Sequence, residues 1–453
     1  MSDTTPQPED GFYVLVTGAN SGLGFAICCR LIDEFLHTRP QSQTLVLIIT
    51  TRDTRKGTDT VARLQKHLQN VRRKAERSFL GISMLLHRRI QFRQEILDLT
   101  SISSVQRHAE RLLNSTPKLN AAILNAGIGG WEGLDWLTAI YTLLTDWVHA
   151  VTYPSYKVSG VGWLTKPQIP ASGNTEKPEE PPLGEVFCAN VFGHYLLCHY
   201  LAPLLSAHKA DEGTVGRIIW TSSLEAYAHT FSLHDFQGLA SSMPYEASKR
   251  LTDILALTAE LPSTAPFVAR YLSSNRPLSV SKSKSSMSNA NKNTIKPKIY
   301  LTHPGICSTG IMPLHHLLTY LMTLAFYIAR WLGSQWHGVT AWNGACAPAW
   351  VALAQQNTLD AMEEREGKGK WGSATDWWGK ERVERTEVEG WGWGGVVGER
   401  IRKKGRRRGV KDLTERDRKQ FEELGRDCWK EMEQLREEWE ARLAAARVGE
   451  DLG

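Results

Sequence analysis

Tyr245 and Lys249 have the side-chain types and the spacing that acid–base chemistry requires. Residues four apart on a helix share one face, so the Lys249 ammonium is expected beside the Tyr245 hydroxyl. A free tyrosine, with a pKa of about 10, is a poor acid or base at neutral pH, and a neighbouring cation lowers that pKa by stabilising the phenolate. Upstream, Ser222 and Ser223 end an apolar run. A serine hydroxyl there can donate a hydrogen bond to a carbonyl oxygen on which charge develops.

A glycine-rich turn near the N-terminus predicts a site for the phosphates of a dinucleotide. It follows the apolar run 12–16 and precedes an apolar, helix-like stretch over 25–32. A strand that ends in such a turn and feeds a helix leaves free backbone N–H groups where a pyrophosphate binds. The spacing is Gly-x-x-x-Gly-x-Gly, which departs from Gly-x-Gly-x-x-Gly, and taken alone it also fits a turn that binds nothing. The residues expected at the cofactor are Gly18, Asn20, Ser21, Gly22, Leu23 and Gly24.

The end of the second expected strand, 44–50, bears on which nicotinamide cofactor binds. An acidic side chain at this place binds the 2′-hydroxyl of NAD, whereas basic side chains can neutralise the 2′-phosphate of NADP. Thr51 and Arg52 come first here and Lys56 follows, so we expect NADPH, against which Asp53 argues. The alternative is that these charges are solvated and only open the next helix.

Short apolar runs alternate with helical stretches up to about residue 310, which predicts an α/β fold with a doubly wound parallel sheet. One cofactor-binding domain is therefore expected over 1–310, with long insertions over 129–183 and 271–297. The second insertion is rich in Ser, Lys and Asn and is expected to be disordered. The expected strands are 12–16, 44–50, 90–97, 119–124, 217–223 and 298–302, and a long basic helix is expected over 57–89.

The succession of these segments resembles the short-chain dehydrogenase/reductase family. The signatures found, in the family's order, are the glycine turn, Asn125-Ala126-Gly127, a mid-helix Asn190, the serine pair, Tyr245 with Lys249, and the turn Pro304-Gly305 that runs to Thr309. Agreement of so many signatures argues against a turn that binds nothing. The resemblance implies a Rossmann-like fold and an oxidoreductase that uses a nicotinamide cofactor.

The resemblance also implies roles for single residues. Tyr245 would donate the proton, Lys249 would lower its pKa and hold the cofactor ribose, and Ser223 rather than Ser222 would bond the substrate. Asn190 would anchor a water in a proton relay. Asp98 would bond the adenine, cap the helix that starts at Ser101, or do both. The full implied cofactor set beyond the glycine turn is Thr51, Arg52, Lys56, Asp98, Asn125, Gly127, Tyr245, Lys249, Ile306, Ser308 and Thr309.

Within the family, segments 191–195, 220–223 and 231–236 resemble the membrane-associated 3-keto-steroid reductases of sterol C-4 demethylation, and 372–376 resembles their fungal members. This implies NADPH-dependent reduction of the 3-keto group of a 4-methyl sterol to the 3β-alcohol in ergosterol biosynthesis. Two alternatives stay open. One is an NADPH-linked reductase of another apolar ketone, such as a 17-ketosteroid, a retinoid or a polyketide. The other is a non-catalytic scaffold of a sterol-processing complex.

The composition of the chain limits its possible partners and its location in the cell. The formal net charge is +6, with basic residues clustered at 402–404 and 406–408, and nothing indicates a nucleic-acid partner. Seven cysteines without a Cys-x-x-Cys pair favour a reduced, cytosol-facing protein without a metal site. Residues 1–10 lack a signal-peptide pattern, so we expect membrane attachment from within the chain. The resemblance implies the endoplasmic-reticulum membrane or lipid droplets, with other enzymes of sterol C-4 demethylation and the sterol cyclase as partners.

Two apolar segments are candidates to cover an apolar substrate or to lie on a membrane. The portion 131–151 of the first insertion is rich in aromatic residues, and 311–332 is mostly apolar. The second is long enough to cross a bilayer as a helix, yet His315, His316 and Arg330 favour a helix in the interface or a buried helix. Segment 311–350 is thus expected to be membrane-associated or substrate-covering.

The remainder, 351–453, is expected to form a helical extension. The stretches 371–376 and 390–395 are aromatic and glycine-rich, which is typical of loops. A charged helix follows, on which apolar residues recur at spacings of mainly three and four. They are Phe421, Leu424, Cys428, Met432, Leu435, Trp439 and Leu443. One narrow apolar stripe predicts docking onto the same chain or onto a partner.

Overall fold

A single twisted sheet organises the computed structural model of the chain, which describes residues 10–77, 86–169, 180–208, 215–273, 294–309, 315–398, 406 and 409–451. The strand order is β12-β11-β10-β8-β4-β1-β2-β3, and every neighbouring pair is parallel except β11 with β12. The strands are β1 Gly11–Val16, β2 Thr44–Thr51, β3 Ile90–Ile96, β4 Ala121–Leu124, β8 Arg217–Thr221, β10 Lys298–His303, β11 Lys370–Thr375 and β12 Glu381–Thr386. The predicted α/β fold with a doubly wound parallel sheet is confirmed.

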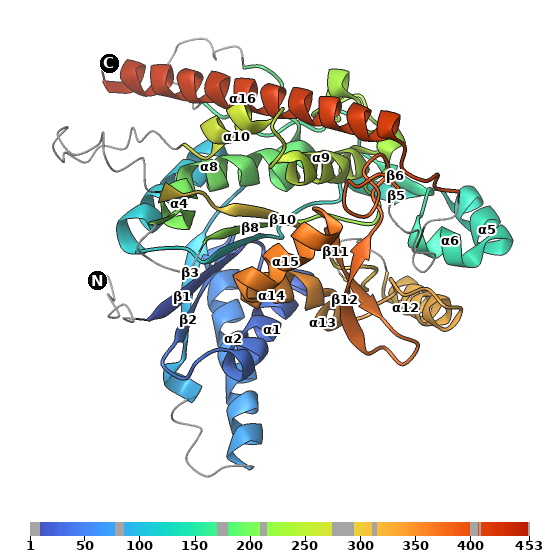
Figure 1. Cartoon of the computed structure of the whole chain (residues 1–453), viewed down its shortest axis with the longest axis horizontal. Helices are drawn as coiled ribbons and strands as arrows, with labels where there is room; N and C mark the ends of the chain where they lie inside the picture. The colour runs from blue at the N-terminus through green and yellow to red at the C-terminus, as the bar shows by residue number, and fades with distance from the viewer. Residues whose placement is uncertain are drawn as a thin grey trace.

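Two hydrophobic cores lie on opposite faces of this sheet. Along β1, Tyr13 and Leu15 point into one core, whereas Val14 and Val16 point into the other, as the alternation of a strand requires. Both faces are covered, which explains why the inner strands β1, β2 and β4 read as nearly continuous apolar runs. Figure 1 shows the helices in two layers. One layer contains α4 Ile102–Ser115, α8 Gly193–Leu205 and α9 Pro244–Thr258; the other contains α1 Gly22–Thr38, α2 Thr54–Glu76, α13 Ala341–Gly344, α14 Cys346–Leu353 and α15 Gln356–Glu366.

The helix expected over 57–89 starts earlier than predicted. Helix α2 begins at Thr54 because the Asp53 side chain accepts a hydrogen bond from the Lys56 N–H at 2.9 Å and so caps the helix. It ends at Glu76, and residues 78–85 of the expected helix lie outside the described residues. The third strand, expected over 90–97, ends one residue earlier, at Ile96.

The interpretation of 371–376 as a loop was wrong. These residues belong largely to β11, which pairs in parallel with β10 and antiparallel with β12. All six residues of β11 are buried, yet Lys370, Ser373 and Thr375 are polar, so neither an apolar run nor a regular alternation marks the strand in the sequence. Gly372 is required because a Cβ there would clash with the rings of His303 and Trp336. The sheet therefore continues past the boundary predicted at residue 310.

The C-terminal helix α16, Glu415–Asp451, docks onto the same chain. It lies along the outside of α9 and α10, Ala265–Tyr271, as Figure 1 shows. Its apolar stripe joins the core beside α8, with Trp429 and Trp439 fully buried. The Trp429 indole N–H donates to the Leu255 carbonyl at 3.2 Å, which ties α16 to α9.

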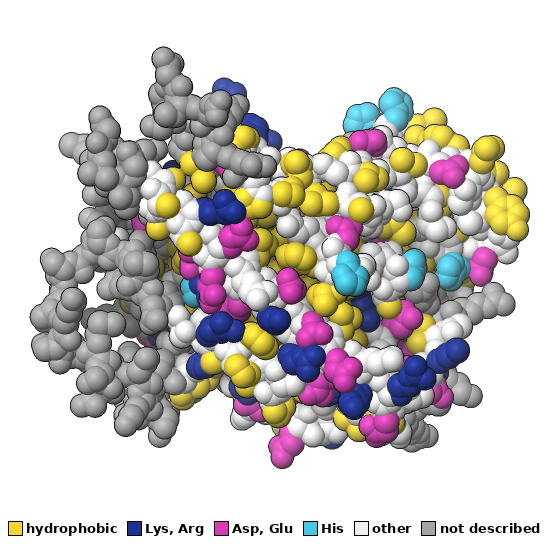
Figure 2. All heavy atoms as spheres, turned by 90° about the horizontal axis from the view of Figure 1, so that it is seen from above, with side chains coloured by type: hydrophobic (Ala, Val, Ile, Leu, Met, Phe, Trp, Pro, Cys, Tyr) yellow, Lys and Arg dark blue, Asp and Glu magenta, His cyan; other side chains and the backbone are white. Residues whose placement is uncertain are grey.

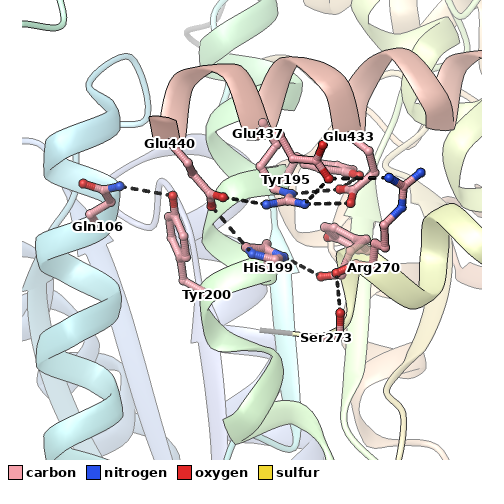
Figure 3. Close-up of polar contacts among 11 residues, drawn as sticks. Gln106, Tyr195, His199, Tyr200, Arg270, Ser273, Glu433, Glu437 and Glu440 are labelled. Carbon is pink, nitrogen blue, oxygen red and sulfur yellow. Dashed lines mark hydrogen bonds and ion pairs between the residues drawn. The ribbon is translucent and has the colours of Figure 1, made fainter. Parts of the chain in front are cut away.

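A buried polar network fixes α16 to α8 as well (Figure 3). The Tyr195 hydroxyl donates to Glu433 at 2.6 Å, and Arg436 binds the same carboxylate with two nitrogens, at 3.0 and 2.8 Å. Nearby, His199 Nδ1 lies 2.7 Å from the Tyr271 carbonyl oxygen. Because a buried carboxylate needs such partners, this network specifies where α16 sits.

The first insertion forms a small unit between β4 and the next core helix. An antiparallel pair, β5 Trp131–Leu134 and β6 Lys157–Ser159, encloses α5 Trp136–Thr145 and α6 Trp147–Thr152. Helix α12, His316–Trp331, packs against α6. Among the described helices, none has the length and apolar character needed to cross a bilayer. Residues 170–179, 274–293 and 310–314 lie outside the described residues, and the disorder expected within 271–297 falls mostly there.

Candidate active site

Tyr245 and Lys249 lie on consecutive turns of α9, next to the end of β8. Pro244 opens this helix, where its missing N–H costs nothing. The Lys249 ammonium lies 5.6 Å from the centroid of the Tyr245 ring and donates to the Thr221 carbonyl at 2.8 Å. The Ser223 side chain lies near enough to Tyr245 to oppose the rise of its pKa, and the Ser223 hydroxyl accepts from the Glu225 N–H at 3.2 Å. The structure therefore brings together the serine, tyrosine and lysine that the sequence selects.

The pKa of Tyr245 is raised, which is the opposite of the direction predicted from the sequence. Burial is the main cause, the Glu225 carboxylate adds to it, and the hydrogen bond from Ser223 opposes it. Burial and the charge of Lys370 lower the pKa of Lys249 to about 8. Tyr245 is consequently a protonated phenol at neutral pH.

Asn190 lies in a π-helical turn, Cys188–Phe192, that precedes α8. Such a turn inserts an extra residue and is frequent at functional sites. The Asn190 side chain accepts from the Ile128 N–H at 2.8 Å. It donates to the Ile128 carbonyl and to the Ser248 hydroxyl, both at 3.0 Å. Gly127 is needed beside it because a Cβ there would lie 2.8 Å from Asn190 Oδ1. Asn190 thus joins the segment after β4 to α9, the helix that carries Tyr245 and Lys249, and its predicted water relay stays a prediction.

The glycine turn presents bare backbone at the start of α1. Gly18 adopts φ +66° and Gly22 φ +52°, conformations that favour glycine. A Cβ at Gly24 would clash with the Gly18 carbonyl, so the first turn of α1 packs tightly under the loop. Ser21 is the N-cap of α1, and no side chain caps the helix. The free N–H groups at this N-terminus fit the pyrophosphate of a dinucleotide.

Thr17 and Asn125 connect the glycine turn to the end of β4. The Thr17 hydroxyl accepts from the Asn125 N–H at 2.9 Å, and the Asn125 amide donates to the Thr17 carbonyl at 3.1 Å. His194 Nε2 lies 2.8 Å from the same hydroxyl, and burial lowers the pKa of His194 to about 3, so its ring is neutral. This network is missing from the sequence-based set, because Thr17 and His194 lie 177 residues apart and no spacing relates them.

The basic residues expected at the cofactor ribose lie at the end of β2. Arg52 and Lys56 are exposed, while Asp53 is engaged as the α2 cap. The buried Thr51 hydroxyl donates to the Asp53 carbonyl at 2.8 Å. Arg63, which the sequence analysis missed, reaches from α2 to the carbonyl oxygen of Asn20 in the glycine turn. Three cationic side chains, Arg52, Lys56 and Arg63, therefore lie near the end of β2 and the glycine turn. The Asp53 carboxylate caps α2.

Asp98 stabilises a turn and does not cap the next helix. Its carboxylate accepts from the backbone N–H of Thr100 at 3.0 Å and from the Thr100 hydroxyl at 2.7 Å. The N-cap of α4 is Ser101, which accepts from the Ser104 N–H. The alternative of a helix cap is therefore wrong for Asp98, and its predicted contact with adenine stays a prediction.

The turn after β10 lies opposite the glycine loop. Ile306 and Ser308 donate their N–H groups to the Trp336 and Val339 carbonyls at 2.7 and 2.8 Å, which fixes the turn. Thr309 approaches the glycine loop, since a Cβ on Gly22 would lie 3.6 Å from Thr309 Cβ. The glycine turn and the Pro304–Thr309 turn thus border one site at the carboxyl edge of the sheet, the edge where α/β proteins bind dinucleotides.

Comparison with known proteins agrees with this geometry. The chain is 47% identical over 461 residues to "3-keto-steroid reductase erg27" of Aspergillus fumigatus, which covers 99% of both chains. The chain belongs to the 3-keto-steroid reductase family. A Gibberella zeae member is 38% identical over 98% of both chains, and a Schizosaccharomyces pombe member is 31% identical over 83% of this chain and 90% of its own. No family model matches the chain.

Similarity to solved structures is distant. A short-chain dehydrogenase/reductase family protein overlaps 78% of this chain and 93% of its own, at a TM-score of 0.37 and 16% identity. Membership of the 3-keto-steroid reductase family therefore rests on the sequence relatives, and the fold rests on the sheet order described above.

Proposed function

We propose that the chain reduces the 3-keto group of a 4-methyl sterol to the 3β-alcohol with NADPH. The observation that carries the proposal is the meeting of Ser223, Tyr245 and Lys249 beside a glycine turn shaped for a dinucleotide, in a chain of the 3-keto-steroid reductase family. Arg52, Lys56 and Arg63 favour the cofactor with a 2′-phosphate, because a cation stabilises that group.

When bound, the cofactor supplies a hydride to the carbonyl carbon of the substrate. Tyr245 donates its phenolic proton to the carbonyl oxygen, and its raised pKa keeps that proton available at neutral pH. The Ser223 hydroxyl stabilises the charge that develops on the same oxygen. Lys249 provides a nearby positive charge for the phenolate that Tyr245 leaves behind.

The surroundings of Tyr245 suit an apolar substrate. Trp131 of the first insertion lies against the Tyr245 ring, with centroids 4.9 Å apart. Val151 and Phe326 form a small apolar cluster with Val339, and this cluster packs against Ile306 of the turn after β10. Both apolar segments therefore flank the proposed site, as the sequence predicts for a sterol ketone. A polar ketone would gain little from such walls.

The same segments support attachment to a membrane surface. Helix α12 exposes Leu317, Leu321 and Leu324, and α5 exposes Leu137 and Leu144. Figure 2 shows hydrophobic side chains gathered at the right-hand end of the molecule, the end that α5 occupies in Figure 1. Exposed apolar helices of this kind bind at the interface of a bilayer without crossing it. The cytosolic face of the endoplasmic reticulum is the proposed location.

A Tyr245→Phe variant tests the reaction. It removes the proton donor and keeps the ring packed against Trp131, so the rate on a 3-keto sterol should fall by at least about 100-fold while NADPH affinity is retained. Stopped-flow absorbance at the nicotinamide band measures the rate, and fluorescence titration measures affinity. Tyr141→Phe, at an exposed tyrosine of α5, is the matched control. A Tyr245→Phe enzyme with most of its activity would refute the mechanism. A wild-type enzyme active on other ketones but on no sterol would refute the substrate.

A further inference from the structure

A buried lysine from the first insertion lies between two carboxylates beside Tyr245. The Lys157 ammonium is 2.7 Å from Glu225 Oε2 and 2.6 Å from Glu246 Oε1. The side chains of Lys157, Glu225 and Glu246 are 3%, 12% and 1% exposed, so water screens these ion pairs little. Glu225 follows β8 and Glu246 is next to Tyr245 on α9. One cation of the insertion therefore joins the two elements that carry the catalytic serine and tyrosine.

The same ammonium also contacts the aromatic rings of the site. It lies 4.2 Å from the centroid of the Trp131 ring and 5.4 Å from that of Tyr245. A cation this close to a ring is attracted by the ring's negative face. Trp131 and Tyr245 meet edge to face. Since Trp131 and Lys157 belong to the paired strands β5 and β6, the base of the insertion is fastened to the tyrosine.

Charges from several elements face the Tyr245 phenol. Lys249 and Glu246 come from its own helix, Glu225 comes from the segment after β8, and Lys157 comes from β6. After burial, Glu225 is the largest cause of the raised pKa of Tyr245, and Glu246 contributes in the same direction. Burial lowers the pKa of Lys157, but Glu225 and Glu246 outweigh it and raise that pKa, so Lys157 is charged at neutral pH.

We infer that Lys157 is a positioning residue of the reaction: its ammonium neutralises the two carboxylates that face the phenol and holds Trp131 against the Tyr245 ring. This role rests on the proposed function. Without the ammonium, the Glu225 and Glu246 carboxylates would remain buried without a counter-charge. Leaving a buried charge unpaired destabilises the fold by more than the intact ion pair stabilises it. Their negative charge would oppose formation of the tyrosinate.

The pH profile of alcohol oxidation, the reverse reaction, tests this role. Tyr245 is then the base, so the rate rises with pH as the phenol loses its proton. In Lys157→Met the rising limb should move to higher pH by at least about 0.5 unit, and kcat should fall more than KM changes. Lys157→Arg, which keeps the charge, should restore the wild-type limb. Lys166→Met, at an exposed lysine of the same insertion, is the matched control and should leave the profile unchanged.

Glu225→Gln keeps the test decisive if Lys157→Met fails to fold. Removing that carboxylate should move the limb to lower pH, and combining Glu225→Gln with Lys157→Met should bring the limb back toward the wild-type position. A lysine that only stabilised the fold would lower the melting temperature and leave the limb of the folded enzyme in place. If the wild type is active and the rising limb of the pH profile does not move in these variants, the role of Lys157 is overturned and the proposed function stands. A wild type that reduces no ketone overturns the proposed function and this role with it.

Discussion

The Ser222 hydroxyl lies 2.5 Å from Oδ1 of Asp253, and this hydrogen bond gives the two serines at the end of β8 different environments. Asp253 lies one turn after Lys249 on α9, and its other oxygen binds the Lys370 ammonium at 2.6 Å. Lys370 in turn donates to the Ser223 carbonyl at 2.6 Å. The backbone of Ser223 is thereby anchored by Lys370. The Ser223 side chain interacts with Tyr245, whereas the Ser222 hydroxyl is bound to Asp253.

Substituting the two serines should therefore give different phenotypes. Ser223→Ala removes a donor to the substrate oxygen, so kcat should fall by about 100-fold or more with little change in the melting temperature. Ser222→Ala leaves the Asp253 carboxylate short of a buried partner and should cost about 1–3 kcal/mol of folding free energy, with a smaller loss of turnover. Steady-state kinetics and urea unfolding of both variants measure this. The reverse pattern would assign the substrate contact to Ser222.

The features that the sequence predicts correctly are those set by the spacing of residues within a single helix or turn. The four-residue separation of Tyr245 and Lys249 and the glycines at the end of β1 are set within one helix and one turn. Contacts between distant segments leave no such pattern. Lys157 meets Glu225 across 68 residues and Lys370 meets Asp253 across 117, and each lysine looks like an ordinary surface charge in the sequence. Strand β11 was missed for the same reason, since its buried Lys370 and Ser373 find their partners, Asp253 and the Gly344 carbonyl, in other segments of the chain.

Arg52 should determine the choice between the two nicotinamide cofactors. It is exposed at the end of β2, where the adenosine ribose of a dinucleotide lies in this fold. The wild type should bind NADPH more tightly than NADH, and Arg52→Asp should reverse the order by repelling the 2′-phosphate. Fluorescence titration with both cofactors measures the affinities. Arg77→Asp makes the same change of charge beyond the last residue of α2 and should keep the wild-type order. Equal wild-type affinities would argue against NADPH.

His67 should make the fold less stable as the pH rises into the alkaline range. Its Nε2 lies 2.7 Å from Asp33 Oδ1, joining α2 to α1, and the hydrogen bonds to Asp33 and then Cys29 raise the pKa of His67 to about 10. Because the folded state holds this proton more tightly, the stabilisation is complete below the ordinary pKa of about 6.5 and is lost as pH rises through about 10.

A His67→Gln variant tests that dependence. Its melting temperature should lie below that of the wild type at pH 6, and the difference should shrink steadily toward pH 10. Differential scanning calorimetry across this range gives the difference at each pH. His37→Gln, at an exposed histidine of α1, should show no such trend. A deficit that is constant with pH would mean that His67 contributes by packing alone.

The exposed leucines of α12 should hold the protein at a membrane. Leu317, Leu321 and Leu324 are 63%, 54% and 52% exposed, whereas Phe326 is buried in the cluster beside Val151. Replacing the three leucines with serine removes apolar surface that a bilayer interface would bury, and it leaves the core intact. The triple variant should keep its melting temperature and its turnover of a detergent-dispersed ketone, yet it should lose co-sedimentation with phospholipid vesicles.

Two further variants separate membrane binding from folding. Val396→Ser removes an apolar side chain that is 50% exposed in the C-terminal extension, and it should leave vesicle binding unchanged. Phe326→Ser opens a cavity between α12 and α6 and should lower the melting temperature instead. If the wild type does not sediment with vesicles, or if the triple variant still does, then α12 is not the membrane-binding surface. The leucines of α5 would then be the next residues to replace.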